Sequence, residues 1–172
     1  SSFCIFVPLA CEDAAAADRF KSPAQAANAG VLSSLPFSDK QDFEDAQRGL
    51  IARPDKLTIR DANGKVVWDL ESYKQFIGLD RPAPATVNPS LWRNAQLNLQ
   101  YGLFKVTDRL YQLRGFDIAN MTVIEGDSGL ILIDPLTTAE VARAALEHYW
   151  AHRPKKPVVA SAWPLATGFS SV

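Results

Sequence analysis

Residues 121–134, MTVIEGDSGLILID, decide the fold. Two runs rich in aliphatic residues, 121–125 and 130–134, flank the turn-forming residues Gly-Asp-Ser-Gly. This pattern predicts two antiparallel strands joined by a tight turn. The second run is almost wholly apolar, which predicts a strand that is covered on both faces.

A strand–helix–strand unit is predicted to follow. Thr137 or Thr138 caps a helix that runs to about Trp150, and residues 157–160 form the next strand. Because the helix lies between the two strands, 130–134 and 157–160 should be parallel neighbours. The core face of the helix is predicted to consist of Ala142, Ala145, Leu146, Tyr149 and Trp150. The second half is therefore predicted to be the first part of a layered α/β domain.

The first half is predicted to be mainly helical. Ser22 before Pro23 is a strong helix start, and Ser38 with Gln41 three residues later predicts a second capped helix. An Asn-Gly turn between β-prone runs predicts a hairpin. The remaining predicted elements are the hairpin strands 57–60 and 65–68, helix 70–77 ending at Gly78, helix 90–101 closed by Gly102, and strands 103–106 and 110–114.

Composition excludes several classes of protein. The 172 residues are 47% hydrophobic and 22% charged, with a formal net charge of -1, so the chain is neither disordered nor basic enough to bind nucleic acid. With two cysteines it cannot be a disulfide scaffold. No apolar run is long enough to span a membrane.

The two ends are predicted to lie outside the folded core. The apolar run 3–11 followed by Ala14–Ala17 fits the back half of a secretory signal peptide, or else a disordered or cloning-derived leader. A lipoprotein-type Cys11 fits poorly. Under the signal-peptide interpretation, Cys4 and Cys11 are discarded residues rather than functional thiols. Residues 161–172 have no periodicity and read as an irregular tail.

Two motifs resemble catalytic or metal sites but favour a structural interpretation. The Gly-Asp-Ser-Gly around Ser128 spells the nucleophile segment of trypsin-like proteases, yet no histidine precedes it to act as base. We therefore interpret it as a turn. His148 and His152 could share a metal ion, but Ala144 stands where a third ligand would be needed. We therefore interpret the two histidines as residues on the flank of the helix and not as metal ligands.

Three polar residues remain as site candidates. Asp134 ends an apolar strand, where α/β proteins often build sites, but it could equally cap a turn. Asp117 and Asn120 lie between two predicted strands. They could line a cleft, although local hydrogen bonding is the favoured interpretation.

Residues 35–159 resemble the amino-terminal part of bacterial alkyl sulfatases of the metallo-β-lactamase superfamily. The resemblance is strongest from Tyr111 through GFDIANMT to IDPLT. The segments that carry it are 35–49, 66–69, 88–96 and 111–137.

The resemblance implies hydrolysis of alkyl sulfate esters such as dodecyl sulfate, by two zinc ions and an activated water. It also implies an αββα sandwich, followed by a helical dimerisation domain and a lipid-binding-like domain. The parent protein is thus expected to be a homodimer, and export to the periplasm or the medium would suit the apolar leader.

The chain departs from this family where the metal motif is expected. After the strand matching 156–160, the family has His-x-His-x-Asp-His, whereas residues 161–172 contain no histidine, aspartate or glutamate. No zinc ligand and no catalytic residue can therefore be assigned. Asp134 alone is transferred, as a residue that supports the metal-motif loop without touching the metal.

We thus predict an α/β (α+β) fold class, an incomplete metallo-β-lactamase-like αββα sandwich with a helical amino-terminal extension. The predicted parts are a leader (1–21), a helical extension with one hairpin (22–102), the first part of the sandwich (103–160) and an aberrant tail (161–172). The predicted function is part of a zinc alkyl sulfatase, inactive and without zinc on its own. The alternatives are a non-catalytic module that binds an amphiphile or a partner, and another hydrolase of the same superfamily.

Overall fold

The computed structural model describes residues 22–163 and divides the chain into two units. One unit contains residues up to 37 together with 82–93, and the other contains 38–81 together with the residues from 94 onward. The predictions for the leader, for Cys4 and Cys11, and for the tail beyond residue 163 lie outside the described residues. The predicted domain boundaries stay predictions.

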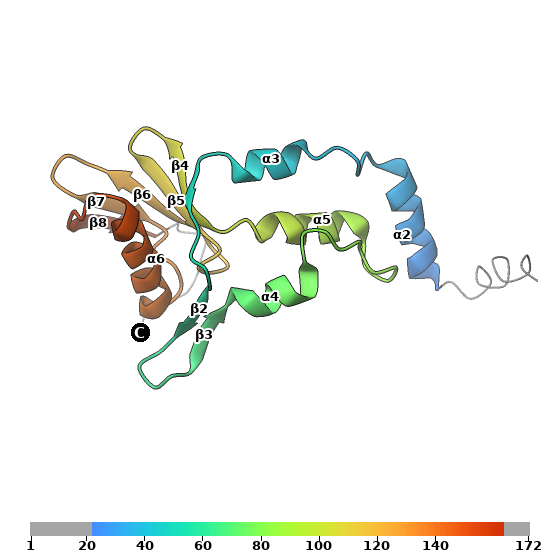
Figure 1. Cartoon of the computed structure of the whole chain (residues 1–172), viewed down its shortest axis with the longest axis horizontal. Coiled ribbons are helices and arrows are strands. Elements are labelled where there is room, and N and C mark those ends of the chain that lie inside the picture. The colour runs from blue at the N-terminus through green and yellow to red at the C-terminus, as the bar shows by residue number, and fades with distance from the viewer. Residues whose placement is uncertain (1–21, 164–172) are drawn as a thin grey trace, which may run out of the picture. The chain divides into compact units, whose positions relative to one another are not determined.

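A six-stranded sheet dominates the larger unit (Figure 1). Its order is β1-β4-β5-β6-β7-β8, with every neighbouring pair antiparallel except β7 and β8. The parallel pair is joined by α6 (Ala139–His152), which Thr138 caps by accepting from Val141 N, so the predicted strand–helix–strand unit is confirmed. The strands are β1 Leu50–Ala52, β4 Gly102–Thr107, β5 Leu110–Arg114, β6 Met121–Glu125, β7 Leu130–Ile133 and β8 Val158–Ala162.

One face of this sheet is closed by α6. Alternate residues along the strands point to the same face, and cross-strand partners such as Val123 and Leu132 are both buried there. From α6, Val141, Ala145 and Tyr149 pack into the same core, and the Tyr149 ring meets Tyr111 edge-on at 5.8 Å. Ala145 and Tyr149 are buried in the core as predicted, and the predicted Ala142, Leu146 and Trp150 are partly buried and pack against it. Val141 joins the core face in addition.

The other face of β7 is open, so the prediction that this strand is covered on both faces is wrong for the described residues. Ile131 and Ile133 remain 37% and 40% exposed, and every residue of β8 is exposed. The reason is topological, because the one helix that connects β7 to β8 returns over a single face. The apolar pattern therefore correctly indicated side chains on both faces, but this part of the chain covers only one of them.

The end of α6 is tied to the sheet by a buried carboxylate. Glu125 is 8% exposed and accepts from Arg153 Nε at 2.8 Å, from Arg153 Nη2 at 2.9 Å and from the Tyr149 hydroxyl. The Arg153 hydrogen bonds lower the pKa of Glu125 despite its burial. Burial, together with Glu125, raises the pKa of Tyr149. The network thus fixes the point from which the chain turns toward β8.

The hairpin and the helix after it form as the sequence predicts. Strands β2 (Thr58–Arg60) and β3 (Val66–Asp69) pair around a turn in which Asp61 Oδ1 accepts from Lys65 N at 2.9 Å. Asp69 then caps α4 (Leu70–Ile77), which ends at Gly78. Leu57 and Ile59 of the hairpin pack into the core that lies under α6.

Two helix boundaries differ from the prediction. Helix α3 (Gln41–Gln47) begins after Lys40 instead of Ser38, because Asp39 Oδ1 accepts from Gln41 N at 2.9 Å. Helix α5 (Pro89–Asn98) stops short of Tyr101, because the bonds of Leu99 N to Gln96 O and Gln100 N to Leu97 O tighten into a turn. Gly102, with φ 125°, then begins β4.

The smaller unit is built around α2 (Pro23–Ser34). Ser22 and Gln25 form the predicted capping box, each side chain accepting from the backbone N–H of the other. No residue of α2 is buried, but Asn28 Nδ2 donates to Ala85 O at 2.9 Å and links it to the proline-rich segment. Among residues 22–163, no helix combines the length and apolar character needed to cross a bilayer.

Candidate functional site

A cavity of about 480 Å³ lies within the larger unit. Its walls come from β3 and α4, from the end of α5 with the following turn, and from residues 114–120, which connect β5 to β6. Most of the lining is apolar, with Trp68, Tyr73 and Ile118 as its largest side chains. The polar residues of the lining are Asn98, Gln100, Arg114, Asp117 and Asn120.

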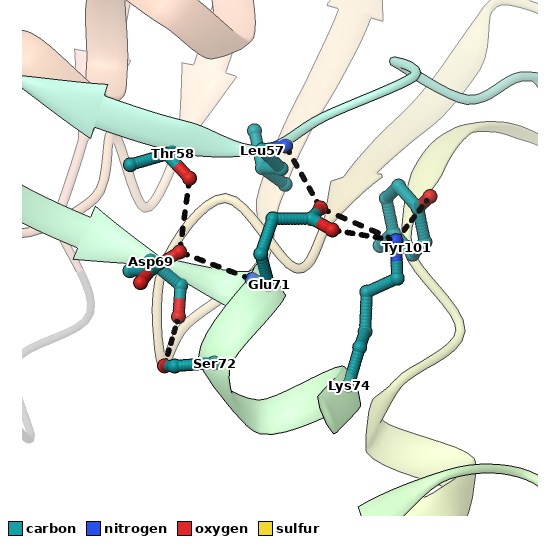
Figure 2. Close-up of polar contacts among 7 residues, drawn as sticks. All are labelled: Leu57, Thr58, Asp69, Glu71, Ser72, Lys74 and Tyr101. Atoms are coloured by element: carbon teal, nitrogen blue, oxygen red, sulfur yellow. Dashed lines mark hydrogen bonds and ion pairs between the residues drawn. The ribbon is translucent and has the colours of Figure 1, made fainter. Parts of the chain in front are cut away.

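A polar cluster joins α4 to the β2–β3 hairpin and to the turn before β4 (Figure 2). Glu71 on α4 accepts from Leu57 N at 3.1 Å and from Lys74 Nζ, which is 3.2 Å from each carboxylate oxygen. Lys74 Nζ also donates to the Tyr101 hydroxyl at 3.2 Å, so α4 is joined to the turn that precedes β4. The cluster thus fixes α4 relative to both the hairpin and Tyr101.

The charges of this cluster are mutually satisfied. The Leu57 N–H is the main cause that lowers the pKa of Glu71, against a smaller opposing effect of burial. Burial acts to lower the pKa of Lys74, but its hydrogen bonds to Tyr101 and Glu71 raise it above the ordinary value. Lys74 therefore stays protonated near neutral pH, which makes it a structural cation rather than a nucleophilic amine.

Gly115 allows the cavity wall to close tightly. Its φ is 81°, and a Cβ placed there would lie 2.4 Å from the Tyr101 Cβ. Its carbonyl accepts from Trp68 Nε1 at 2.7 Å, which fixes the indole ring as part of the lining. No other residue type could combine this backbone conformation with this approach.

Arg114 is a half-buried cation whose partners among residues 22–163 are neutral. Its Nε donates to Gln112 Oε1 at 3.0 Å, its Nη1 donates to Ala46 O at 3.3 Å, and its guanidinium lies 4.3 Å from the centre of the Phe104 ring. Burial lowers its pKa, and within residues 22–163 no carboxylate forms an ion pair with it.

Asp117 both forms local hydrogen bonds and lines the cavity. The sequence left these two roles open as alternatives, and the structure shows both. It is 7% exposed, and Oδ2 accepts from Thr137 N at 2.7 Å and from Thr137 Oγ1 at 2.6 Å. Oδ1 accepts from Ile118 N at 2.7 Å. Asn120 also lines the cavity. Asp117 thus clamps residues 115–120 to the segment that follows β7.

Asp134 stands at the end of β7 in a strained turn. Its φ is 55° and that of Leu136 is 72°, values that non-glycine residues adopt at a cost. Its Oδ1 accepts from Leu136 N at 3.4 Å, and its N donates to the O of Ala162, the last residue of β8. Asp134 therefore bonds within its own turn, and its support of a metal-motif loop stays a prediction.

The Gly-Asp-Ser-Gly segment is a turn, as predicted. Gly126 N donates to Gly129 O at 2.8 Å between β6 and β7, and Ser128 is exposed. A Cβ on Gly129 would lie 2.4 Å from Val159 Cγ1, so this glycine is needed where β8 packs against β7.

His148 and His152 lie together on α6 with their ring centres 4.8 Å apart. His148 Nε2 is 3.4 Å from Ala52 O, and His152 Nδ1 is 2.9 Å from His148 O. In the described part of the chain, no three histidine, cysteine, aspartate or glutamate side chains are grouped so that they could hold a metal ion.

No local sequence pattern predicts the cavity itself. Trp68 and Arg114 come from strands that are far apart in the chain, and Gln100 lies in a turn that was predicted to be helical. An arginine on the polar side of an alternating strand is ordinary, so nothing in its local pattern marks Arg114 as a cavity residue.

Comparisons with known proteins identify the relatives of this chain. No protein-family model matches it. It is 62% identical over 135 residues to the (R)-specific secondary-alkylsulfatase of Pseudomonas sp, and 54% identical over 132 residues to the alkyl/aryl-sulfatase BDS1 of Saccharomyces cerevisiae. It is 48% identical over 136 residues to a linear primary-alkylsulfatase of Pseudomonas sp. These matches span 77–79% of this chain and 20% of each relative.

The solved structures agree. The stereoselective inverting sec-alkylsulfatase Pisa1 from Pseudomonas sp. matches 82% of this chain and 22% of its own, with a TM-score of 0.75 and 60% sequence identity. The chain is therefore a mixed α/β protein with the fold of part of a sulfatase. More narrowly, it is homologous to the alkylsulfatases, and the resemblance inferred from the sequence is confirmed.

Proposed function

We propose that this chain is part of a zinc-dependent alkyl sulfatase, which hydrolyses alkyl sulfate esters to an alcohol and sulfate. The observation that carries the proposal is 48–62% identity to three relatives named as alkylsulfatases. Because the chain spans 20% of their length, it would supply part of the framework of such an enzyme.

We further propose that the sheet belongs to a metallo-β-lactamase-like αββα sandwich. The open face of β7 supports this, because Ile131 and Ile133 present apolar surface that a second sheet would bury. In that arrangement α6 is the outer layer on one side. Export and a homodimeric parent protein also stay proposals.

The described side chains do not fit a pair of zinc ions. The 172 residues hold two histidines, and both lie on one flank of α6. In the complete enzyme, zinc would lower the pKa of a bound water and polarise the sulfate ester. We propose that residues outside this chain hold the zinc, that Asp134 supports the loop that carries them, and that the chain alone does not turn over.

A chimera tests this proposal directly. Residues 22–160 would replace the matching segment of the Pseudomonas (R)-specific secondary-alkylsulfatase, and sulfate release from an alkyl sulfate would be measured with and without a chelator. We expect zinc-dependent turnover by the chimera and none by the 172-residue chain. A folded but inactive chimera would contradict the function, and turnover by the chain alone would contradict the proposed inactivity.

A second candidate function is favoured by the cavity. The chain could bind an amphiphile without cleaving it, because a largely apolar cavity of about 480 Å³ with a few polar groups is typical of ligand sites. Titration of the chain with an alkyl sulfate, with sulfate release followed in the same sample, separates binding from hydrolysis. Failure to bind would reject this candidate and leave the chimera result untouched.

A further inference from the structure

We propose that Asp117 is a positioning residue of the alkyl sulfatase reaction. Its carboxylate holds residues 134–137, the turn that follows β7, in the strained backbone conformation that the reaction requires. This inference rests on the proposed alkyl sulfatase function. It deepens that function by assigning to it a side chain that acts through the backbone of another segment.

The strained backbone of the 134–137 turn is the first argument. Asp134 has a φ of 55° and Leu136 has a φ of 72°. Such conformations are costly for residues that carry a Cβ, and they persist only where the surrounding structure fixes them. Among residues 22–163, Arg109 is the only other non-glycine residue with a positive φ. The fold therefore maintains a particular geometry at this turn against a local cost.

The position of the turn in the sheet is the second argument. Strands β7 and β8 are the parallel pair of the six-stranded sheet, and the turn follows the carboxyl end of β7. Asp134 N donates to Ala162 O at 2.9 Å, so the turn is also joined to the carboxyl end of β8. In open α/β sheets, sites are built at the carboxyl ends of the strands. A turn fixed at this edge is therefore placed to orient groups of the complete enzyme.

Asp117 is the side chain that holds this turn from another segment. It lies in the connection between β5 and β6 and is 7% exposed. Its Oδ2 accepts from Thr137 N at 2.7 Å and from Thr137 Oγ1 at 2.6 Å, while its Oδ1 accepts from Ile118 N. Hydrogen bonds to a carboxylate are stronger than those between neutral groups. Because Thr137 comes directly after Leu136, these bonds fix the end of the strained turn.

Two neighbouring threonines separate the turn from the helix that follows it. Thr137 donates to Asp117, whereas Thr138 caps α6 by accepting from Val141 N at 3.4 Å. Both threonines are exposed, so a substitution at either position leaves the core of the sheet intact. Loss of the Thr137 hydroxyl removes a bond that holds the turn, and loss of the Thr138 hydroxyl removes the helix cap. The two positions therefore distinguish positioning of the turn from general stability.

Steady-state kinetics of the chimera described above test the inference. Thr137→Val should lower kcat by at least about fivefold and leave KM within about twofold, because a displaced turn disturbs the geometry of the reaction without removing a substrate contact. Thr137→Ser keeps the hydroxyl and should retain the activity of the unmodified chimera. Thr138→Val is the matched control, which should lower the thermal unfolding midpoint but keep kcat.

Hydrogen exchange in the 172-residue chain tests the contact between Asp117 and the turn without any reaction. The amides of Asp134 and Leu136 donate to Ala162 O and to the Asp134 carboxylate. Asp117→Asn should speed the exchange of both amides by at least about tenfold relative to the amides of the β2–β3 hairpin. Because Thr137 is exposed, Thr137→Val provides the same readout if Asp117→Asn fails to fold.

The possible results separate this inference from the proposed function. An active chimera whose kcat is unchanged by Thr137→Val, or is lowered equally by Thr138→Val, would overturn positioning by Asp117 and leave the alkyl sulfatase function standing. Unchanged exchange in both Asp117→Asn and Thr137→Val would overturn the inference in the same way. An inactive unmodified chimera would overturn the proposed function and this inference together.

Discussion

The two faces of the six-stranded sheet are built from the same strands but are completed to different degrees. On the covered face, Val123 and Leu132 pair across β6 and β7 beneath α6. On the opposite face, Ile124 pairs with Ile131, and Ile131 stays 37% exposed. Neighbouring residues of one strand therefore lie in a closed core and on an open surface.

The difference teaches that one crossover helix closes one face only. Helix α6 and the β2–β3 hairpin together carry side chains that fill this side of the sheet. At β7 and β8 the open face carries apolar residues that no other described layer covers, whereas Phe104 on the same face of β4 is buried. Exposed apolar surface of this kind is typical of an interaction site.

The largest expected effect comes from comparing adjacent residues of β7. Leu132→Ala should lower the free energy of unfolding by about 2–5 kcal/mol, because it leaves a cavity under α6. Ile131→Ala should cost about 1 kcal/mol, because that side chain already meets water. Urea unfolding of both variants measures the difference. Equal losses would mean that the open face is covered in solution, for example by a second copy of the chain.

The next comparison concerns two glycines that share a backbone conformation. Gly64 and Gly115 have φ values of 82° and 81°, but only Gly115 would place a Cβ against Tyr101. Gly64→Ala should cost about 1–2 kcal/mol from the left-handed backbone alone. Gly115→Ala should cost about 1–3 kcal/mol more from the clash. Thermal or urea unfolding gives both values, and equal losses would show that the cavity wall yields easily.

A smaller effect is expected from the buried carboxylate at the end of α6. Glu125→Gln keeps the shape but removes the charge that holds Arg153, and should cost about 1.5–3 kcal/mol. The exposed Arg48–Asp45 pair is the matched control, and Asp45→Asn should cost less than about 0.5 kcal/mol. A cost for Glu125→Gln as small as that of the control would show that α6 is held by apolar packing alone.

The pH dependence of the same pair has a definite sign. Arg153 holds the folded-state pKa of Glu125 below its ordinary value of 4.5. The stabilisation is therefore fully present above about pH 4.5 and is lost as the pH falls through the lower, folded-state pKa. The stability difference between the wild type and Glu125→Gln should shrink on acidification below that point. A difference that stays constant would contradict the ionised pair.

Most of the fold could be predicted from caps, turns and residue periodicity, because each of these patterns depends on residues that are close together in the chain. The Ser22 cap, the Asn-Gly turn, the helix from Leu70 to Ile77 and the parallel β7–β8 pair all form as expected. The two wrong helix boundaries share a cause. Neighbouring residues compete to cap or end the helix, and the sequence alone does not show which of them succeeds. Asp39 displaces Ser38 at the start of α3, and a turn at Leu99 ends α5 early.

The site was less predictable, because it is assembled from distant segments. Asp117 and Asn120 were recognisable as polar residues between strands, and both line the cavity. What the sequence could not reveal is that Arg114 would be half-buried in the lining of the same cavity as Trp68. That property depends on how the β2–β3 hairpin, α4 and residues 115–120 pack together, and no local pattern encodes it.

The smallest expected effect is the titration of His148, which is partly buried, whereas His152 on the same flank of α6 is exposed. Burial lowers the pKa of His148 below 6.5, against the opposing effect of its contact with Ala52 O. Because the unfolded chain takes up the proton first as the pH falls, stability should be complete above about pH 6.5 and should decline below it, toward the lower folded-state pKa. His148→Gln should flatten this decline, whereas His152→Gln, which changes the exposed neighbour, should leave most of it in place. Urea midpoints on either side of pH 6.5 measure the slope, and an unchanged slope in His148→Gln would show that this flank of α6 is open to water.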